Sequence, residues 1–133
     1  MNKFALDTNI LIYSHDENAN DKQNIARDLI VRSPVVSAQV VSEYISVLKR
    51  IVKIPKELIF SACLPNLRHC QIQTVDVATL QTAERLMLRY DFQIFDAIVV
   101  ASALENGCQI LYSEDMQHKM KIEKQLTIIN PFL

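Results

Sequence analysis

The stretch FALDTNILIY, residues 4 to 13, places three polar side chains between two apolar segments. A buried strand or helix normally carries apolar side chains, whereas Asp7, Thr8 and Asn9 offer a carboxylate, a hydroxyl and an amide in a row. We interpret residues 3–6 as a short buried strand, and the apolar residues after Asn9 as the start of a helix. Asp7 then stands at the carboxyl end of the strand.

The rest of the chain alternates short apolar runs with longer runs at helical spacing. This alternation is typical of an α/β domain with a largely parallel sheet. The predicted strands are residues 3–6, 34–37, 71–74, 109–112 and 127–129. The predicted helices are residues 21–31, 39–52, 56–64, 77–89 and 96–106; the last is apolar nearly all round and should be buried. No repeat or linker divides the chain, so we expect one domain over residues 1–133.

Composition excludes several classes of protein. The chain has one glycine, Gly107, so neither a Walker loop nor a G-x-G-x-x-G turn is possible. Its three cysteines show no C-x-x-C spacing, which argues against a disulfide framework and a zinc site. No apolar stretch is long enough for a signal peptide or a membrane span, so we expect a cytoplasmic protein. The net charge of −1 does not by itself indicate nucleic-acid binding.

Four acidic residues are predicted to meet at one edge of the sheet. Asp7 and Asp115 each follow a predicted strand, and parallel strands end at the same edge. The connecting helices begin at that edge too, which brings Asp96 and Glu43 there, the latter from the first turns of residues 39–52. Each acid alone would be an ordinary helix cap, turn or surface residue. Gathered together, carboxylates about 4 Å apart repel by roughly 4 kcal/mol at an effective dielectric of about 20, so a cation should complete the site.

The donor atoms indicate which cation this is. Carboxylate oxygens favour Mg²⁺ or Mn²⁺ over Zn²⁺, which prefers nitrogen and sulfur. The three histidines have no paired metal-ligand spacing and are interpreted as surface or turn residues, with His118 alone retained as a contact to substrate. Mg²⁺ with open coordination positions activates water and stabilises the charge that grows on a phosphodiester. The sequence therefore predicts nuclease chemistry.

Four motifs carry a resemblance to a known family. LDTNILIY, VVSEY, FDAIVVASALENG and ILYSEDMQH, in this order and spacing, resemble the PIN-domain ribonucleases, in particular the VapC-type toxins of bacterial toxin–antitoxin pairs. The similarity extends from Lys3 to Pro131. It implies a three-layer α/β/α domain with a short, mainly parallel sheet, and an endoribonuclease that depends on Mg²⁺ or Mn²⁺. It also implies a homodimer, and inhibition by a cognate antitoxin whose tail enters the acidic cleft.

The resemblance also assigns roles by position. It implies that the catalytic and metal-binding acids are Asp7, Glu43, Asp96 and Asp115, with Thr8, Asn9 and Ser113 hydrogen-bonding around them. Glu114, beside the last acid, is expected to assist or replace it. Relatives with the Q-H ending commonly continue with glycine where this chain has Lys119.

Two alternatives belong to other classes. A catalytically silent PIN-like module would use the acidic cleft to hold a basic peptide or a partner protein. In a phosphotransferase with an aspartate nucleophile, an Asp-Thr dipeptide would also follow a strand. That class needs a second aspartate in a D-x-D pattern, and Asn9 occupies the position.

Overall fold

The computed structural model describes residues 2–133 and contains a six-stranded sheet with the order β3-β2-β1-β4-β6-β5. The strands are β1 (Phe4–Leu6), β2 (Val35–Ser37), β3 (Gln71–Gln73), β4 (Ile110–Tyr112), β5 (Lys121–Ile122) and β6 (Leu126–Ile129). All neighbouring pairs are parallel except β5 and β6. The predicted α/β fold with a short, mainly parallel sheet is therefore confirmed.

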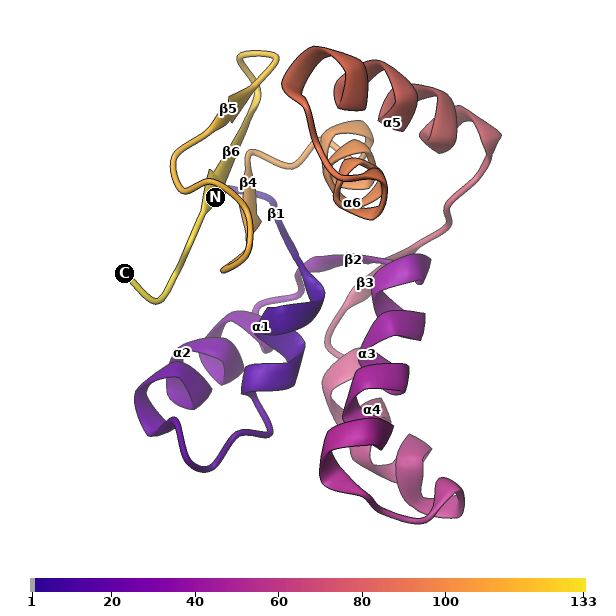
Figure 1. Ribbon diagram of the computed structural model, residues 1–133. Helices are drawn as coiled ribbons and strands as arrows, with labels where there is room; N and C mark the ends of the chain where they lie inside the picture. Colours follow the sequence, from indigo (N-terminus) through magenta and orange to yellow (C-terminus); the bar gives the residue numbers. More distant parts are fainter. Residues whose placement is uncertain (1) are drawn as a thin grey trace.

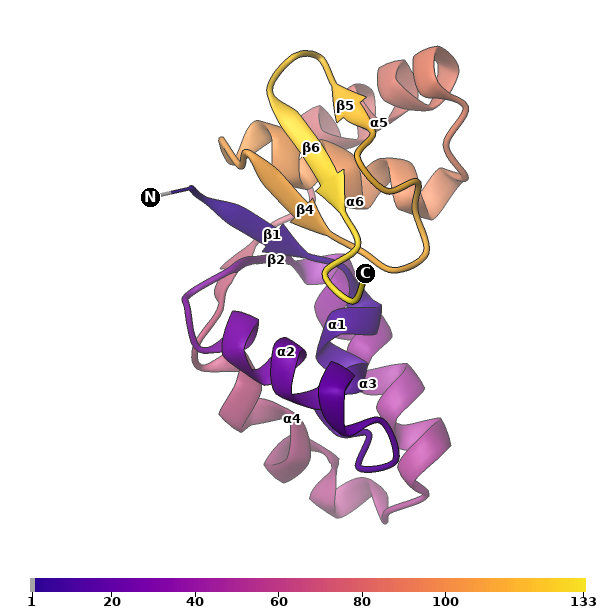
Figure 2. The same ribbon diagram turned by 90° about the vertical axis from the view of Figure 1, so that its left-hand side faces the viewer.

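Helices lie on both faces of this sheet (Figure 1). They are α1 (Thr8–Tyr13), α2 (Asn20–Ile30), α3 (Ala38–Val52), α4 (Ile59–Leu67), α5 (Val77–Tyr90) and α6 (Ile94–Glu105), with a 3-10 turn, η1 (Lys56–Leu58), before α4. Figure 2 shows α5 and α6 behind β4 and β6, and α1 to α4 as a second group near the carboxyl end of β1. On the face away from α6, Ile25 and Leu29 of α2 lie beside Tyr112 of β4.

The apolar patterns of the sequence explain how these layers pack. In α3, Val40, Tyr44 and Leu48 recur every four residues and are fully buried, so one face of the helix rests on the core. In α6 the buried side chains are mostly small, among them Val100 and Ala101, which lets the helix approach the sheet closely. No helix within residues 2–133 is long and apolar enough to cross a lipid bilayer.

Several helix ends follow the predicted chemistry. Asp76 caps α5 by accepting a hydrogen bond from the Thr79 N–H at 3.0 Å. Gly107 adopts a φ of +73° directly after α6, the left-handed conformation expected of a stop signal. Lys53 and Asp91 take the same conformation after α3 and α5 without being glycine. Lys119 also lies in this region, at φ +69°, where the resemblance leads us to expect glycine.

Four element predictions need correction. Helix α1 begins at Thr8 instead of Ile10, because the Asp7 side chain accepts a hydrogen bond from the Thr8 N–H and caps the helix. Helix α6 begins at Ile94 instead of Asp96, because the Gln93 side chain accepts hydrogen bonds from two N–H groups of the first turn. The segment predicted as a helix over residues 56–64 starts as η1 and continues as α4 to Leu67. Strand β5 was not predicted, because two residues are too few to show an alternating pattern.

Candidate functional site

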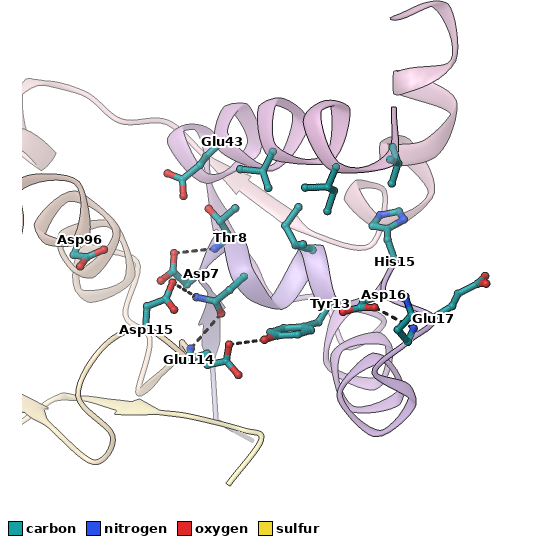
Figure 3. Close-up of a pocket in the computed structure, with 16 residues that line it drawn as sticks. Asp7, Thr8, Tyr13, His15, Asp16, Glu17, Glu43, Asp96, Glu114 and Asp115 are labelled. Atoms are coloured by element: carbon teal, nitrogen blue, oxygen red, sulfur yellow. Dashed lines mark hydrogen bonds between the residues drawn. The ribbon is translucent and has the colours of Figure 1, made fainter. Parts of the chain in front are cut away.

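An open cleft of about 670 Å³ lies where β1 meets α1, between α3, α6 and the loop after β4. Figure 3 shows Glu43, Asp96 and Asp115 around Asp7, each from a different element. All four predicted acids line this one cleft. The expectation that strand ends and helix starts would bring them together is therefore met by the geometry, while their roles stay a prediction.

Asp7 is the most deeply buried of these acids, with 6% of its surface exposed. Its N–H donates to the Tyr112 carbonyl at 3.0 Å, which fixes it at the end of β1. One carboxylate oxygen accepts from the Thr8 N–H and the other from the Ser113 hydroxyl, both at 2.8 Å. Asp7 is thus both the cap of α1 and a side chain of the cleft.

The environment of Asp7 disfavours its charged form. Burial raises the pKa of Asp7 to about 6, against the opposing effect of the hydrogen bonds from Ser113 and Thr8. The negative charges of Asp96 and Glu43 raise it further. A cation next to Asp7 would reverse this balance, because it would stabilise the ionised carboxylate.

Asp96 and Glu43 face Asp7 from two helices (Figure 3). Asp96 lies half-buried in the first turn of α6, and burial raises its pKa, followed by the charges of Asp115 and Glu43. Glu43 is exposed on α3, whose start is fixed by the Ser37 hydroxyl accepting from the Val40 N–H at 3.2 Å. These acids therefore interact electrostatically across the cleft.

The loop after β4 is held to α1 by a short chain of hydrogen bonds. The Asn9 amide donates to the Asp115 carboxylate at 3.0 Å and accepts from the Glu114 N–H at 3.2 Å. The Ser113 hydroxyl donates to Asp7 and accepts from the Asp115 N–H at 3.2 Å. Asn9 and Ser113 thus make the kind of contacts that the resemblance implies.

Thr8 contacts the site differently from its two neighbours. Its N–H bonds to Asp7, but its hydroxyl oxygen is buried and has no hydrogen-bond partner among residues 2–133. Thr8 is 5% exposed and lines the cleft. Leaving a buried hydroxyl unsatisfied costs roughly 1–3 kcal/mol, so a hydrogen bond to this group would stabilise the site.

Glu114 does not stand free beside Asp115. Its carboxylate accepts a hydrogen bond from the Tyr13 hydroxyl at 2.6 Å and pairs with the Lys22 ammonium at 2.7 Å. Burial acts to raise the pKa of Glu114, but the hydrogen bonds from Lys22 and Tyr13 outweigh it and the pKa is lowered. The carboxylate expected to assist Asp115 is thus already engaged.

The four acids suit a hard divalent cation. Within residues 2–133 none of them forms an ion pair with lysine, arginine or histidine. In the same part of the chain, no three His, Cys, Asp or Glu side chains lie together as a compact cage. Mg²⁺ does not need such a cage, because one or two carboxylates and several waters commonly hold it. An all-oxygen set with no counter-charge fits Mg²⁺ or Mn²⁺.

His15 is a cleft residue that the sequence interpretation missed. It is half-buried, and its Nε2 lies 2.5 Å from the hydroxyl of Tyr44. Burial, and then the charge of Arg27, lowers its pKa. His15 lies in the turn after α1, and no spacing in the sequence marked it as a cleft residue.

His118, which we retained as a contact to substrate, lies elsewhere. Its Nδ1 accepts a hydrogen bond from the Asn130 N–H at 2.9 Å, and it does not line the cleft. Its side chain fixes the segment after β6, and a contact to substrate stays an untested alternative.

The sequence matches the PIN domain family over residues 4–122. The chain belongs to this family. Its four motifs, the strands β1 to β5 and the residues that line its acidic cleft all lie within the matched region, so the resemblance to PIN domains is confirmed. A comparison with curated protein sequences gives no match.

Solved structures of similar fold include a toxin, a toxin–antitoxin complex and a complex with DNA. VapC20 of Mycobacterium tuberculosis, described as a sarcin-ricin loop cleaving toxin, is 17% identical with a TM-score of 0.67, over 85% of this chain and 90% of that chain. A toxin–antitoxin complex from Klebsiella pneumoniae is 17% identical with a TM-score of 0.70, over 97% of both chains. FitAB bound to an IR36 DNA fragment is 15% identical with a TM-score of 0.70, over 98% of this chain and 96% of that one. At these identities the likeness establishes the fold.

Proposed function

We propose that this PIN domain is a metal-dependent endoribonuclease and the toxin of a toxin–antitoxin pair. The observation that carries the proposal is Asp7, a buried carboxylate with a raised pKa that faces three more acids, none of them paired with a basic side chain of residues 2–133. The unpartnered Thr8 hydroxyl beside it also indicates a ligand. Similarity in fold to VapC20, described as a sarcin-ricin loop cleaving toxin, favours RNA as the substrate.

The acids would hold Mg²⁺ or Mn²⁺, and the residues around them would fix their geometry. The ion supplies Lewis acidity and activates water for attack on a phosphodiester. Ser113 and the Thr8 N–H hold the two oxygens of Asp7, and Asn9 orients Asp115. The Thr8 hydroxyl would donate to a water or a phosphate oxygen in the cleft. The products would carry a 5′-phosphate and a 3′-hydroxyl, as the resemblance implies.

The same cleft would receive the antitoxin. Beyond the acids it continues over the apolar side chains of Ile12, Val47, Ile51 and Val52. A partner segment that carries both basic and apolar side chains fits such a surface, and the Klebsiella pneumoniae structure of similar fold is a toxin–antitoxin complex. We further propose that the protein acts as a homodimer in the cytoplasm. Light scattering of the purified protein would measure the dimer.

Cleavage of RNA by purified protein tests the nuclease. With Mn²⁺ or Mg²⁺ the wild type should cleave, and EDTA should stop the reaction. Asp7→Asn and Asp96→Asn should lose roughly 100-fold or more, since even the outer partners of metal ligands cost 10–100-fold. Asp28→Asn makes the same chemical change at an exposed site that does not line the cleft and should leave cleavage intact. Undiminished cleavage by Asp7→Asn would show that the site is elsewhere.

The silent binding module remains the second candidate, because the apolar extension of the cleft also suits a peptide. Calorimetric titration with Mn²⁺ separates the two functions. A nuclease site should take up the ion and lose it in Asp7→Asn, whereas a cleft that only binds peptide need not respond.

Expression in bacteria tests the toxin. The chain alone should arrest growth, and Asp7→Asn should relieve the arrest. Coexpression of the protein encoded next to it should relieve the arrest as well, if that protein is the antitoxin. Normal growth of bacteria that express the soluble wild-type chain would contradict the toxin function, while the nuclease function would stand.

A further inference from the structure

Glu114 and Asp115 are neighbours in the chain, but their carboxylates are used differently. Glu114 points to Tyr13, away from the centre of the cleft, while Asp115 lies near Asp7 (Figure 3). We propose that Tyr13, Lys22 and Glu114 form a clamp that positions the Asp115 carboxylate for cation binding. This inference rests on the proposed metal-dependent function and makes Glu114 a positioning residue instead of a metal ligand.

The clamp is a partly buried ion pair between Lys22 and Glu114, and two aromatic rings lie beside the lysine. The Lys22 and Glu114 side chains are 39% and 25% exposed and meet at 2.7 Å. The Tyr13 hydroxyl bonds to the other Glu114 oxygen at 2.6 Å. The Lys22 ammonium also lies 4.7 Å from the centre of the Tyr13 ring and 5.4 Å from that of Phe132. Two contacts thus hold the Glu114 carboxylate, and two aromatic rings hold the lysine that pairs with it, which distinguishes this pair from an isolated surface ion pair.

Asn9 transmits the position of Glu114 to Asp115. The Glu114 N–H donates to the Asn9 carbonyl oxygen, and the Asn9 amide nitrogen donates to the Asp115 carboxylate. Because the amide group is planar, anchoring its oxygen also directs its nitrogen. On the other side of the loop, the Ser113 hydroxyl binds both Asp7 and the Asp115 N–H. The clamp and Ser113 therefore fix the loop from two sides.

Without the clamp, repulsion would favour other positions of this loop. Asp115 carries no ion pair with any residue that the structure describes, and its charge acts on Asp96 across the cleft. An exposed acid that faces like charges moves away from them when its backbone is free to move. Hydrogen bonds to Asn9 and Tyr13 of α1 and the ion pair to Lys22 of α2 hold the loop at the rim instead.

The competing interpretation is that Glu114 is a spare metal ligand, and the two make opposite predictions for Lys22→Met. If Glu114 is a spare metal ligand, removing Lys22 frees the Glu114 carboxylate and should tighten Mn²⁺ binding. If Glu114 belongs to a clamp, removing Lys22 should weaken Mn²⁺ binding by about 10-fold, since loss of the outer partners of metal ligands lowers metal affinity 10–100-fold. Glu114→Gln should weaken binding to a similar extent, and Lys22→Arg, which keeps the charge, should restore it.

Mn²⁺ titration by calorimetry at one ionic strength measures this. Lys121→Met, an exposed lysine on the edge strand β5, is the matched control for loss of one positive charge and should bind as the wild type does. Urea unfolding of each variant checks folding, because a purely structural contact would lower stability without changing the Mn²⁺ Kd. Tighter or unchanged binding in Lys22→Met would overturn the clamp. No binding by the wild type would instead contradict the proposed function.

Discussion

Asp7 illustrates a conflict between folding and the proposed chemistry. In the unfolded chain its pKa has the ordinary value of 3.8, and in the folded protein without a cation it is about 6. Below both values the residue is protonated in both states. As the pH rises from 3.8 to 6, only the unfolded chain loses the proton, so folding stability falls. Above pH 6 the loss is complete, at roughly 3 kcal/mol for about two pKa units.

Asp7→Asn should therefore stabilise the metal-free protein. At pH 7.5 the free energy of unfolding should exceed that of the wild type by up to roughly 3 kcal/mol, because the amide carries no charge to bury. Near pH 4 the difference should shrink toward zero. Urea unfolding across this pH range measures it, with Asp28→Asn as the exposed control. A variant that is less stable at pH 7.5 would show that the charged form is favoured in the fold.

The Thr8 hydroxyl offers a second test at a single atom. Thr8→Val keeps the shape and removes a buried group that has no partner, so stability should stay equal or rise by up to about 1 kcal/mol. RNA cleavage should fall, by on the order of 10-fold if one hydrogen bond to a ligand is lost. Ser102→Ala removes the other unpartnered buried hydroxyl found in residues 2–133, within α6, and should leave cleavage unchanged. Equal cleavage by Thr8→Val would assign its hydroxyl no function.

The sequence predicted helices and strands most accurately where their apolar pattern is long. The stripe of α3, read from Val40, Tyr44 and Leu48, is repeated often enough to identify both the helix and its buried face. The start of α6 was misjudged, because glutamine is not a usual cap and Gln93 serves as one. Short strands such as β5 have too few residues to show a repeating apolar pattern, so they are recognised only from their pairing in the sheet.

The scarcity of glycine makes the left-handed residues informative. Lys119 is exposed, adopts φ +69°, and donates its N–H to the Ile128 carbonyl at 2.7 Å. Lys119→Gly removes a strain of roughly 1–2 kcal/mol, partly offset by about 0.5–1 kcal/mol of extra freedom in the unfolded chain. The free energy of unfolding should rise by roughly 0.5 kcal/mol. Lys119→Ala, which keeps a Cβ, should bring no such gain; a clear loss in Lys119→Gly would point to a stabilising lysine side chain.

At the scale of the whole molecule, the topology was enough to predict where the acidic residues meet. Parallel strands end at one edge and helices begin there, so the order of elements sufficed to bring Asp7, Glu43, Asp96 and Asp115 to one cleft. Topology does not determine which way adjacent side chains point. Asp115 faces the acids while Glu114 turns to Lys22, a residue distant in sequence, and only packing of α1 and α2 decides this.

The whole-molecule charge leads to the last prediction. The net charge is −1, yet seven of the fifteen acidic residues line one cleft, so the negative potential is concentrated there. An ion that binds this cleft in the folded state alone stabilises the fold by mass action, by about 2.7 kcal/mol at 100 times its Kd. Urea unfolding at pH 7.5 with increasing Mn²⁺ should show this rise in the wild type.

Variants and salt separate a specific site from general screening. Asp96→Asn should lose most of the Mn²⁺-dependent rise, and Asp28→Asn should keep it, because only the former lies in the cleft. NaCl at matched ionic strength screens charges without filling a site. If NaCl stabilised the protein as much as Mn²⁺ does, relief of repulsion would explain the effect and no bound cation would be needed; a rise confined to Mn²⁺ and lost in Asp96→Asn requires an ion held by these carboxylates.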